Sequence, residues 1–235
     1  MKLETREWGS GDRVAVLIHG VMSDSRNWRR VGPALAEDGY RVIAVDLRGH
    51  GRTGHAESYT LAEIAADVAE TVPSAPRLVM GHSLGGLVIP HILDALAPER
   101  AIYVDPPFHF RGLPLRLRVM FTLFRTGLFR VTPEKLAKMN PQWEAEDIEA
   151  EIDNFRIFDS RILRVVLKNP QWHLPPSAAS IPSLMVLADN SLAVLPEMRA
   201  HLEGIGYEFR VVKGAGHTVN RDDFDGFMDA LSGWI

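Results

Sequence analysis

The run from Leu78 to Leu87 constrains the fold of this chain more than any other stretch. Three apolar residues lead into Gly-His-Ser-Leu-Gly, and apolar residues at helical spacing follow as far as Leu96. This order predicts a strand, a tight turn and a helix, with Ser83 at the apex of the turn. Gly81 and Gly85 stand two positions on either side of the serine, where a Cβ would collide as the strand turns back into the helix.

The predicted turn has a chemical consequence. It exposes the hydroxyl of Ser83 above the sheet, and it places the backbone amide of Leu84 at the N-terminus of a helix. An unpaired N–H group at that place, together with the helix dipole, stabilises an oxyanion that develops nearby. The pattern G-x-S-x-G also occurs by chance in loops, but its position between an apolar strand and an amphipathic helix favours a nucleophilic serine.

Composition limits the classes of protein to which the chain can belong. With 235 residues and 46% apolar composition, it can bury one substantial core. A formal net charge of −4 gives no electrostatic case for nucleic acid as a partner, and the lack of cysteine excludes disulfides and thiolate metal sites. The N-terminal residues carry charges where a signal peptide needs an apolar core, and no uncharged apolar run reaches the ~18 residues that span a bilayer. We therefore expect a soluble, cytoplasmic protein without stable membrane insertion.

Strand and helix patterns alternate through most of the chain. Largely apolar runs, typical of strands buried on both faces of a parallel sheet, occur at residues 14–18, 41–45, 78–80, 101–104 and 183–188. Helical spacing follows at 28–38, 60–71 and 87–96, a weak alternation at 3–8 predicts an edge strand, and 207–213 predict a last strand before a C-terminal helix. The alternation predicts an α/β protein with a mostly parallel, doubly wound sheet.

The alternation stops between residues 106 and 182. Residues 108–130 hold five arginines and no acidic residue among many large apolar side chains, and residues 134–159 are acid-rich with a helical pattern. We interpret 106–182 as a helical cap inserted into a core made of residues 1–105 and 183–235. For residues 108–130 three interpretations stay open: cap helices with their arginines in water, a mobile lid over a lipophilic substrate, or a membrane-surface contact.

Four short motifs carry a resemblance to a known family. They are His19-Gly20 followed by Trp28, Asp46-Leu47-Arg48-Gly49-His50-Gly51, Gly81-His82-Ser83-Leu84-Gly85, and Gly214-Ala215-Gly216-His217. With these motifs in this order, the chain resembles the α/β-hydrolase fold family over essentially its whole length. The resemblance implies a nucleophile elbow, a Ser-acid-His triad, an oxyanion hole and a cap over the pocket. It does not fix the substrate, because this fold hosts many chemistries.

The resemblance gives roles to the matching residues. Ser83 carries over as the nucleophile, and His217, in the glycine-rich turn after the last strand, carries over as the base. A serine hydroxyl is a poor nucleophile unless a neutral imidazole takes its proton during attack. The oxyanion donors would be the backbone N–H groups of Val21 and Leu84, with Met22 as a lesser candidate. Three other histidines lie in loops that the family uses structurally: His19, His50 and His82.

The chain departs from the family pattern at the acid. The usual aspartate lies three residues after a glycine that closes the strand before the last one, but here the stretch reads Ala188-Asp189-Asn190-Ser191. Serine therefore stands where the aspartate is expected. Asp189 directly follows that strand, and Asp105 ends the preceding strand, where some members of the family carry their acid. A turn-capping role for Asp189 and a structural role for Asp105 are the alternatives, and both stay candidates with a slight preference for Asp105.

Together these features predict a serine hydrolase that cleaves an ester, lactone or related carbonyl bond of a small apolar substrate through an acyl-enzyme. The residues supply nucleophile, base and electrophilic assistance, so we expect no metal and no organic cofactor. Two other functions stay open: a lyase or carbon–carbon bond hydrolase using the same residues, and a non-catalytic ligand-binding protein. The pair of Ser83 and His217 argues against the second, since a receptor has no need of a base.

Overall fold

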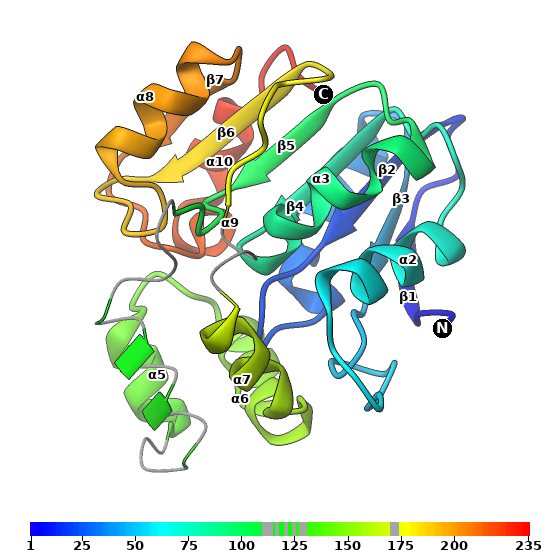
Figure 1. Ribbon diagram of the computed structural model, residues 1–235. Coiled ribbons are helices and arrows are strands. Elements are labelled where there is room, and N and C mark those ends of the chain that lie inside the picture. Colours follow the sequence, from blue (N-terminus) through cyan, green and yellow to red (C-terminus); the bar gives the residue numbers. More distant parts are fainter. Residues whose placement is uncertain (110–114, 116–117, 120–121, 124–125, 127–130, 170–173) are drawn as a thin grey trace.

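A seven-stranded sheet organises the described residues of this protein, whose structure is a computed structural model (Figure 1). The structure describes residues 1–235 except 110–114, 116–117, 120–121, 124–125, 127–130 and 170–173. The strands are β1 (Thr5–Trp8), β2 (Arg13–Ile18), β3 (Tyr40–Val45), β4 (Leu78–His82), β5 (Ala101–Val104), β6 (Ser183–Ala188) and β7 (Glu208–Val212). Their order in the sheet is β1-β3-β2-β4-β5-β6-β7, and only β1 runs antiparallel to its neighbour.

Burial on both faces explains the apolar sequences of the central strands. Along β2, Ala15 and Leu17 belong to one apolar core, while Val16 and Ile18 belong to another. Because successive side chains of a strand point to opposite faces, a strand covered on both sides is apolar at every position. The edge strand β1 has no fully buried residue, in keeping with its weaker alternation.

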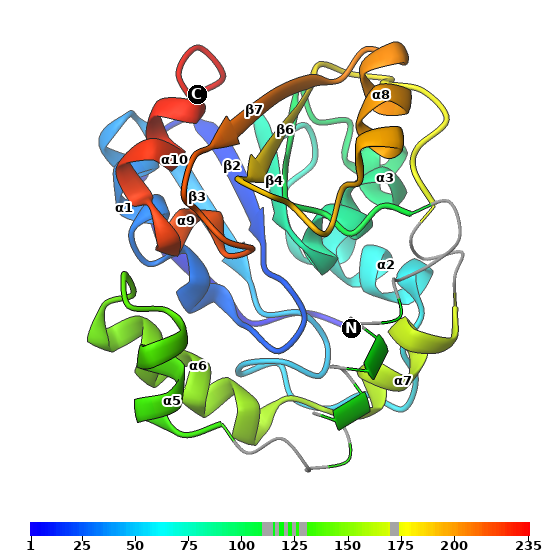
Figure 2. The same cartoon turned by 90° about the vertical axis from the view of Figure 1, so that its left-hand side faces the viewer.

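Helices cover both faces of the sheet (Figures 1 and 2). One face carries α2 (Leu61–Thr71), α3 (Leu84–Leu96) and α8 (Pro196–Gly204). The other carries α1 (Val31–Glu37), which follows the short 3-10 helix η1 (Ser25–Trp28), together with α9 (Val219–Asp222) and α10 (Phe224–Ala230). The predicted fold class, a mostly parallel and doubly wound α/β sheet, is therefore confirmed.

Between β5 and β6 the described residues form α5 (Pro133–Met139), α6 (Ala145–Ile157) and α7 (Arg161–Lys168). These helices lie beyond the carboxyl ends of the parallel strands (Figures 1 and 2). They fall within the insertion predicted at 106–182, but much of the arginine-rich segment 108–130 lies outside the described residues. Phe108, at the start of that segment, is buried in the core with its ring centroid 6.2 Å from that of Tyr103.

Ion pairs attach α6 to the core of the protein. Three of them lie within hydrogen-bond distance: Arg29 with Asp147 (2.8 Å), Arg26 with Asp153 (3.1 Å) and Arg221 with Glu151 (2.8 Å). On its other side α6 packs against α5 through Leu136, Ile148 and Ile152. None of the helices in the described part of the chain is long and apolar enough to cross a membrane.

Candidate active site

Ser83 lies in a strained turn between β4 and α3. Its backbone dihedrals are φ 51° and ψ −113°, outside the regions that L-residues prefer. A Cβ on Gly81 would lie 2.4 Å from the carbonyl carbon of Gly85, and one on Gly85 would lie 2.2 Å from the carbonyl oxygen of Ile18. Only glycine fits at both positions, so the collision expected from the sequence is confirmed. The turn places Ser83 in the wall of a cavity.

His217 and Asp105 meet at the same cavity. His217 lies in the loop between β7 and α9, and Asp105 follows the last residue of β5. Nδ1 of His217 is 2.7 Å from Oδ2 of Asp105, while Oδ1 of Asp105 accepts a hydrogen bond from the amide of Ala188 at 3.3 Å. Within the described residues, no hydrogen bond joins the Ser83 hydroxyl to the His217 ring. Such contacts are often long before substrate binds and tighten in the substrate complex.

The carboxylate of Asp105 fixes the chemistry of the His217 ring. Since an ionised carboxylate accepts hydrogen bonds only, Nδ1 carries the proton and Nε2 is the nitrogen left to accept one. The side chain of His217 is half-exposed. Partial desolvation of the ring lowers the pKa of His217, but the hydrogen bond and the charge of Asp105 raise it, with a further contribution from the charge of Asp222. The net shift of the pKa is upward, so His217 is a stronger base than a free histidine.

Asp189 also lines the cavity but holds a different partner. Its Oδ2 accepts a hydrogen bond from the amide of Gly214 at 3.1 Å, and its own amide donates to the carbonyl of Ala215 at 3.0 Å. Asp189 thus stabilises the turn that precedes His217. Ser191, at the position where the family acid is expected, uses its hydroxyl to accept from the amides two and three residues further on, both at 3.1 Å. These are the short-range bonds typical of turn residues.

Two backbone amides at the cavity wall are candidates for an oxyanion hole. Val21 and Leu84 both line the cavity, and Leu84 is the first residue of α3. Within the described residues neither amide donates to another group of the protein, as an oxyanion donor requires. The amide of Met22, the lesser candidate, instead donates to Nε2 of His50 at 3.2 Å.

Buried histidines support the loop that carries Val21. His19 accepts a hydrogen bond from the amide of Leu47 at 2.9 Å through Nε2, and Nδ1 of His50 donates to the carbonyl of Arg48 at 3.0 Å. Burial, followed by the neighbouring His19, lowers the pKa of His50 to about 3, so the ring is neutral and its Nε2 can accept. Both histidines therefore have structural partners on the loop that follows β3.

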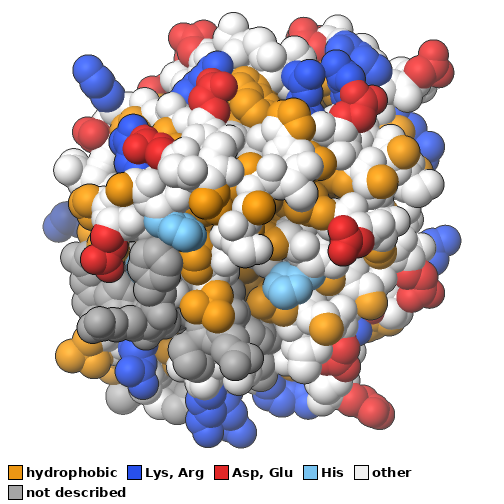
Figure 3. Space-filling model, turned by 45° about the horizontal axis from the view of Figure 1, so that its top comes forward, with side chains coloured by type: hydrophobic (Ala, Val, Ile, Leu, Met, Phe, Trp, Pro, Cys, Tyr) orange, Lys and Arg blue, Asp and Glu red, His pale blue; other side chains and the backbone are white. Residues whose placement is uncertain are grey.

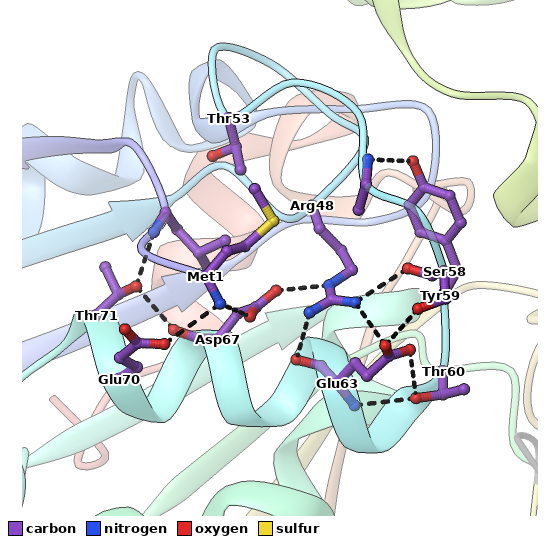
Figure 4. A network of polar contacts seen from close by, with 12 residues as sticks. Met1, Arg48, Thr53, Ser58, Tyr59, Thr60, Glu63, Asp67, Glu70 and Thr71 are labelled. Carbon is purple, nitrogen blue, oxygen red and sulfur yellow. Dashed lines mark hydrogen bonds and ion pairs between the residues drawn. The ribbon is translucent and has the colours of Figure 1, made fainter.

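Arg48 fastens that supporting loop to helix α2 (Figure 4). Its Nε lies 2.6 Å from Oδ2 of Asp67, and its Nη1 donates to the carbonyl of Ser58 at 3.0 Å. Asp67 also binds the terminal amino group of Met1. Both Arg48 and Asp67 are buried, so the pair is shielded from solvent.

His82 contacts the candidate base from the elbow side. Its Nε2 lies 2.9 Å from the carbonyl oxygen of His217, and the two ring centroids are 4.9 Å apart. Burial, followed by the nearby His217, lowers the pKa of His82 well below its ordinary value. The ring is therefore neutral, and its Nε2–H donates to the carbonyl and holds the backbone of the His217 turn.

The cavity itself has a volume of about 650 Å³ and a largely apolar wall. Its apolar residues include Val21, Leu84, Leu87, Pro107, Val166 and Leu192. Among the described residues that line it there is no lysine or arginine. On the face drawn in Figure 3, histidine side chains reach the surface beside hydrophobic side chains. In the described ranges, no three histidine, aspartate or glutamate side chains are grouped so that they could hold a metal ion.

Comparison with known proteins decides the family. Residues 15–230 match the model of the alpha/beta hydrolase family. The chain belongs to this family. The family resemblance stated from the motifs is therefore confirmed, and the expectation of a hydrolase is confirmed at the level of the family.

Curated relatives of this alpha/beta hydrolase have several activities. It is 27% identical to a bifunctional epoxide hydrolase 2 from Sus scrofa over 86% of this chain and 47% of the relative. It is 30% identical to lipase LipV from Mycobacterium tuberculosis over 64% of this chain and 60% of the relative. A pimeloyl-[acyl-carrier protein] methyl ester esterase from Sodalis glossinidius is 42% identical over 34% of this chain and 30% of the relative. The chain thus matches less than two thirds of the length of each of these relatives.

Solved structures share the fold. An esterase from Exiguobacterium antarcticum superposes with a TM-score of 0.76 at 16% identity, over 99% of this chain and 94% of the other. A deformylase from Pseudomonas putida S16 has the same TM-score at 23% identity, over 98% of this chain and 96% of the other. At these identities the likeness concerns the fold.

Sequence reasoning missed three residues beside the site. Gln142 lines the cavity, and the indole nitrogen of Trp143 donates to Oδ1 of Asp222 at 2.6 Å. Gln142 and Trp143 come from the loop before α6, and Asp222 ends α9. Nothing in the spacing of the sequence signals this contact, because it joins the insertion to the loop of His217.

Proposed function

We propose that this alpha/beta hydrolase is a serine hydrolase that cleaves an ester, lactone or related carbonyl bond of a small apolar substrate. The observation that carries the proposal is the 2.7 Å contact between His217 and Asp105 at the cavity that Ser83 lines. A buried carboxylate on one nitrogen of an imidazole, beside a serine held in a strained elbow, is the arrangement that nucleophilic catalysis by serine needs.

In the first half of the proposed reaction, Oγ of Ser83 attacks the carbonyl carbon of the substrate. The hydroxyl proton passes to Nε2 of His217, and Asp105 holds the ring and stabilises the imidazolium. The carbonyl oxygen becomes an oxyanion, which accepts hydrogen bonds from the amides of Val21 and Leu84. When the tetrahedral intermediate collapses, the imidazolium returns the proton to the leaving alcohol, and an acyl-enzyme remains on Ser83.

In the second half, water replaces the alcohol. His217 takes a proton from the water as it attacks the acyl carbonyl, and the same two amides bind the oxyanion. Collapse of this intermediate breaks the bond to Ser83, whose oxygen recovers the proton from His217. The product is a carboxylic acid, and the enzyme returns to its starting state.

The composition of the cavity wall supports the proposal of an apolar substrate. Because apolar residues dominate it and no lysine or arginine is among its described lining residues, the transfer of an uncharged acyl or alkyl group out of water is favourable there. Gln142 and Val166 bring the insertion to the cavity wall, so we assign α5, α6 and α7 to a cap over the substrate. The lipase and esterase names among the relatives agree with this substrate class.

A substrate panel tests the proposal. Purified protein is assayed on p-nitrophenyl esters of graded chain length and on lactones, with the Ser83→Ala variant beside it. We expect turnover of at least one neutral ester or lactone, and a loss of roughly 10³-fold or more in Ser83→Ala, because nucleophile and base act as a unit. Undiminished turnover in a folded Ser83→Ala variant would show that the nucleophile is another group.

A further inference from the structure

The carboxylate of Asp222 lies against the turn that carries His217. Asp222 is the last residue of α9, five positions after the histidine. A Cβ on Gly216 would lie 2.9 Å from Oδ2 of Asp222, so the carboxylate lies directly beside the backbone of this residue. The side chain therefore contacts the residue that directly precedes the candidate base.

The same carboxylate also binds the insertion. Nε1 of Trp143 donates to Oδ1 of Asp222 at 2.6 Å, and Trp143 directly follows Gln142 in the sequence. Gln142 is at the same time part of the cavity wall. One carboxylate thus connects the wall of the cavity to the His217 turn.

The residue before Asp222 strengthens this connection. The guanidinium of Arg221 lies over the ring of Trp143, 4.9 Å from its centroid, and donates to Glu151 of α6 at 2.8 Å. Arg221 is almost fully buried, so these contacts are shielded from water. Two consecutive residues of α9 therefore hold the insertion and the His217 turn together.

Among the described residues, the charges that act on the His217 ring come from two places in the fold. Asp105, after β5, binds Nδ1 directly, and Asp222, on α9, acts through its charge alone. His82, from β4, is neutral and contacts the His217 carbonyl. The two carboxylates act in the same direction, since each favours a protonated ring.

We propose that Asp222 is a positioning residue: it binds Trp143, the neighbour of Gln142 in the cavity wall, lies against the His217 turn, and adds its charge to that of Asp105 in stabilising the imidazolium. The proposal rests on the proposed function. A substrate that presses on Gln142 acts on the neighbour of Trp143, and the partner of Trp143, Asp222, lies against the His217 turn, so filling of the cavity and placement of the base are connected.

Two variants separate the charge of Asp222 from its bonds. Asp222→Asn keeps an acceptor for Trp143 but removes the charge, and Trp143→Phe removes the donor but keeps the charge. Asp225→Asn is the matched control, because Asp225 is exposed on the neighbouring helix α10. Circular dichroism and melting temperature establish that each variant is folded.

The readouts are the NMR titration of the His217 ring, assigned with His217→Ala, and the pH profile of kcat/KM. We expect Asp222→Asn to lower the midpoint of both relative to Asp225→Asn. We expect Trp143→Phe to lower kcat roughly tenfold at an unchanged midpoint, since a misplaced base is a less effective one. If Asp222→Asn does not fold, Asp222→Glu replaces it. We expect this variant to have a lower kcat than the wild type and a His217 titration midpoint near that of the wild type.

Each contrary result has a distinct meaning. The role of Asp222 would be overturned if His217 titrated with the same midpoint in Asp222→Asn and in Asp225→Asn. Where Asp222→Glu is used instead, a kcat equal to that of the wild type would overturn it. A kcat of wild-type size in Trp143→Phe would overturn the tie to the insertion. The NMR titration is measured without substrate, so its result does not depend on the proposed function. The proposed function has its own test: it fails if Ser83 of the wild type does not react with a fluorophosphonate.

Discussion

Oδ2 of Asp105 lies 2.7 Å from Nδ1 of His217, although 112 positions separate the two residues in the sequence. The contact crosses the end of β6, whose own aspartate, Asp189, binds the turn before the histidine instead. Asp105 has a φ of 44°, a left-handed conformation that a residue without a special role seldom adopts. The geometry therefore favours Asp105 as the acid of the proposed triad.

The first prediction compares the two aspartates. Asp105→Asn removes the charge that stabilises the imidazolium, so we expect turnover to fall by roughly 10²-fold or more. Asp189→Asn weakens one hydrogen bond in a turn, so we expect a loss below about tenfold. Steady-state kinetics on both purified variants make the comparison, and the opposite order of losses would give the role to Asp189.

The second prediction concerns pH. His217 must be neutral to take the proton of Ser83, and the net effect of its surroundings is to raise its pKa. Activity should therefore be lost on acidification with a midpoint above the ~6.5 of a free histidine, and be retained at higher pH. The pH profile of kcat/KM measures this midpoint. A rate that stays flat to about pH 4.5, in protein shown to be folded there, is not compatible with a histidine base.

The third prediction uses two glycines with different surroundings. A Cβ on Gly85 would lie 2.2 Å from a backbone oxygen, whereas one on Gly204, at the end of α8, would meet nothing within 4 Å. We expect Gly85→Ala to reduce the free energy of unfolding by more than about 2 kcal/mol. Gly204→Ala should change it by less than about 1 kcal/mol, in the stabilising direction. Urea unfolding of both variants tests the difference, and equal effects would contradict the close packing of the elbow.

The fourth prediction concerns the buried pair of Arg48 and Asp67 (Figure 4). Arg48→Ala leaves a buried carboxylate with fewer partners, and we expect a loss of about 3 kcal/mol in the free energy of unfolding. Arg77→Ala breaks a much more exposed pair with Glu99, and a loss below about 1 kcal/mol is expected. Chemical denaturation compares them. Similar losses in the two variants would mean that the loop after β3 does not depend on the pair.

Much of the fold could be predicted because the central strands are buried on both faces. Residues 14–18 are apolar at every position, and they form β2 between β3 and β4. The turn at Ser83 could also be predicted, because the need for glycine at positions 81 and 85 follows from local steric contacts. The burial of Phe108 could not be predicted: this residue packs against Tyr103 in the apolar core, and the contact depends on the path of the chain and not on composition.

The partners of the site residues were harder to predict. The sequence shows which residues end neighbouring strands, so it limited the acid to Asp105 and Asp189. It does not show which carboxylate reaches the histidine, because this depends on turn geometry after β5 and β6. The contact of Trp143 with Asp222 joins residues 79 positions apart, and no periodicity records it.

Covalent labelling tests the central claim, that Ser83 is an activated nucleophile, most directly. The protein is treated with a fluorophosphonate, which loses fluoride when a serine oxygen attacks its phosphorus, and the modified peptide is located by mass spectrometry. We predict a single adduct on the peptide that contains Ser83, formed rapidly at pH 8 and slowly at pH 5. No adduct should form in Ser83→Ala, and none should form at an appreciable rate in His217→Ala. An unlabelled wild-type protein, or an adduct that persists in Ser83→Ala, would contradict the account.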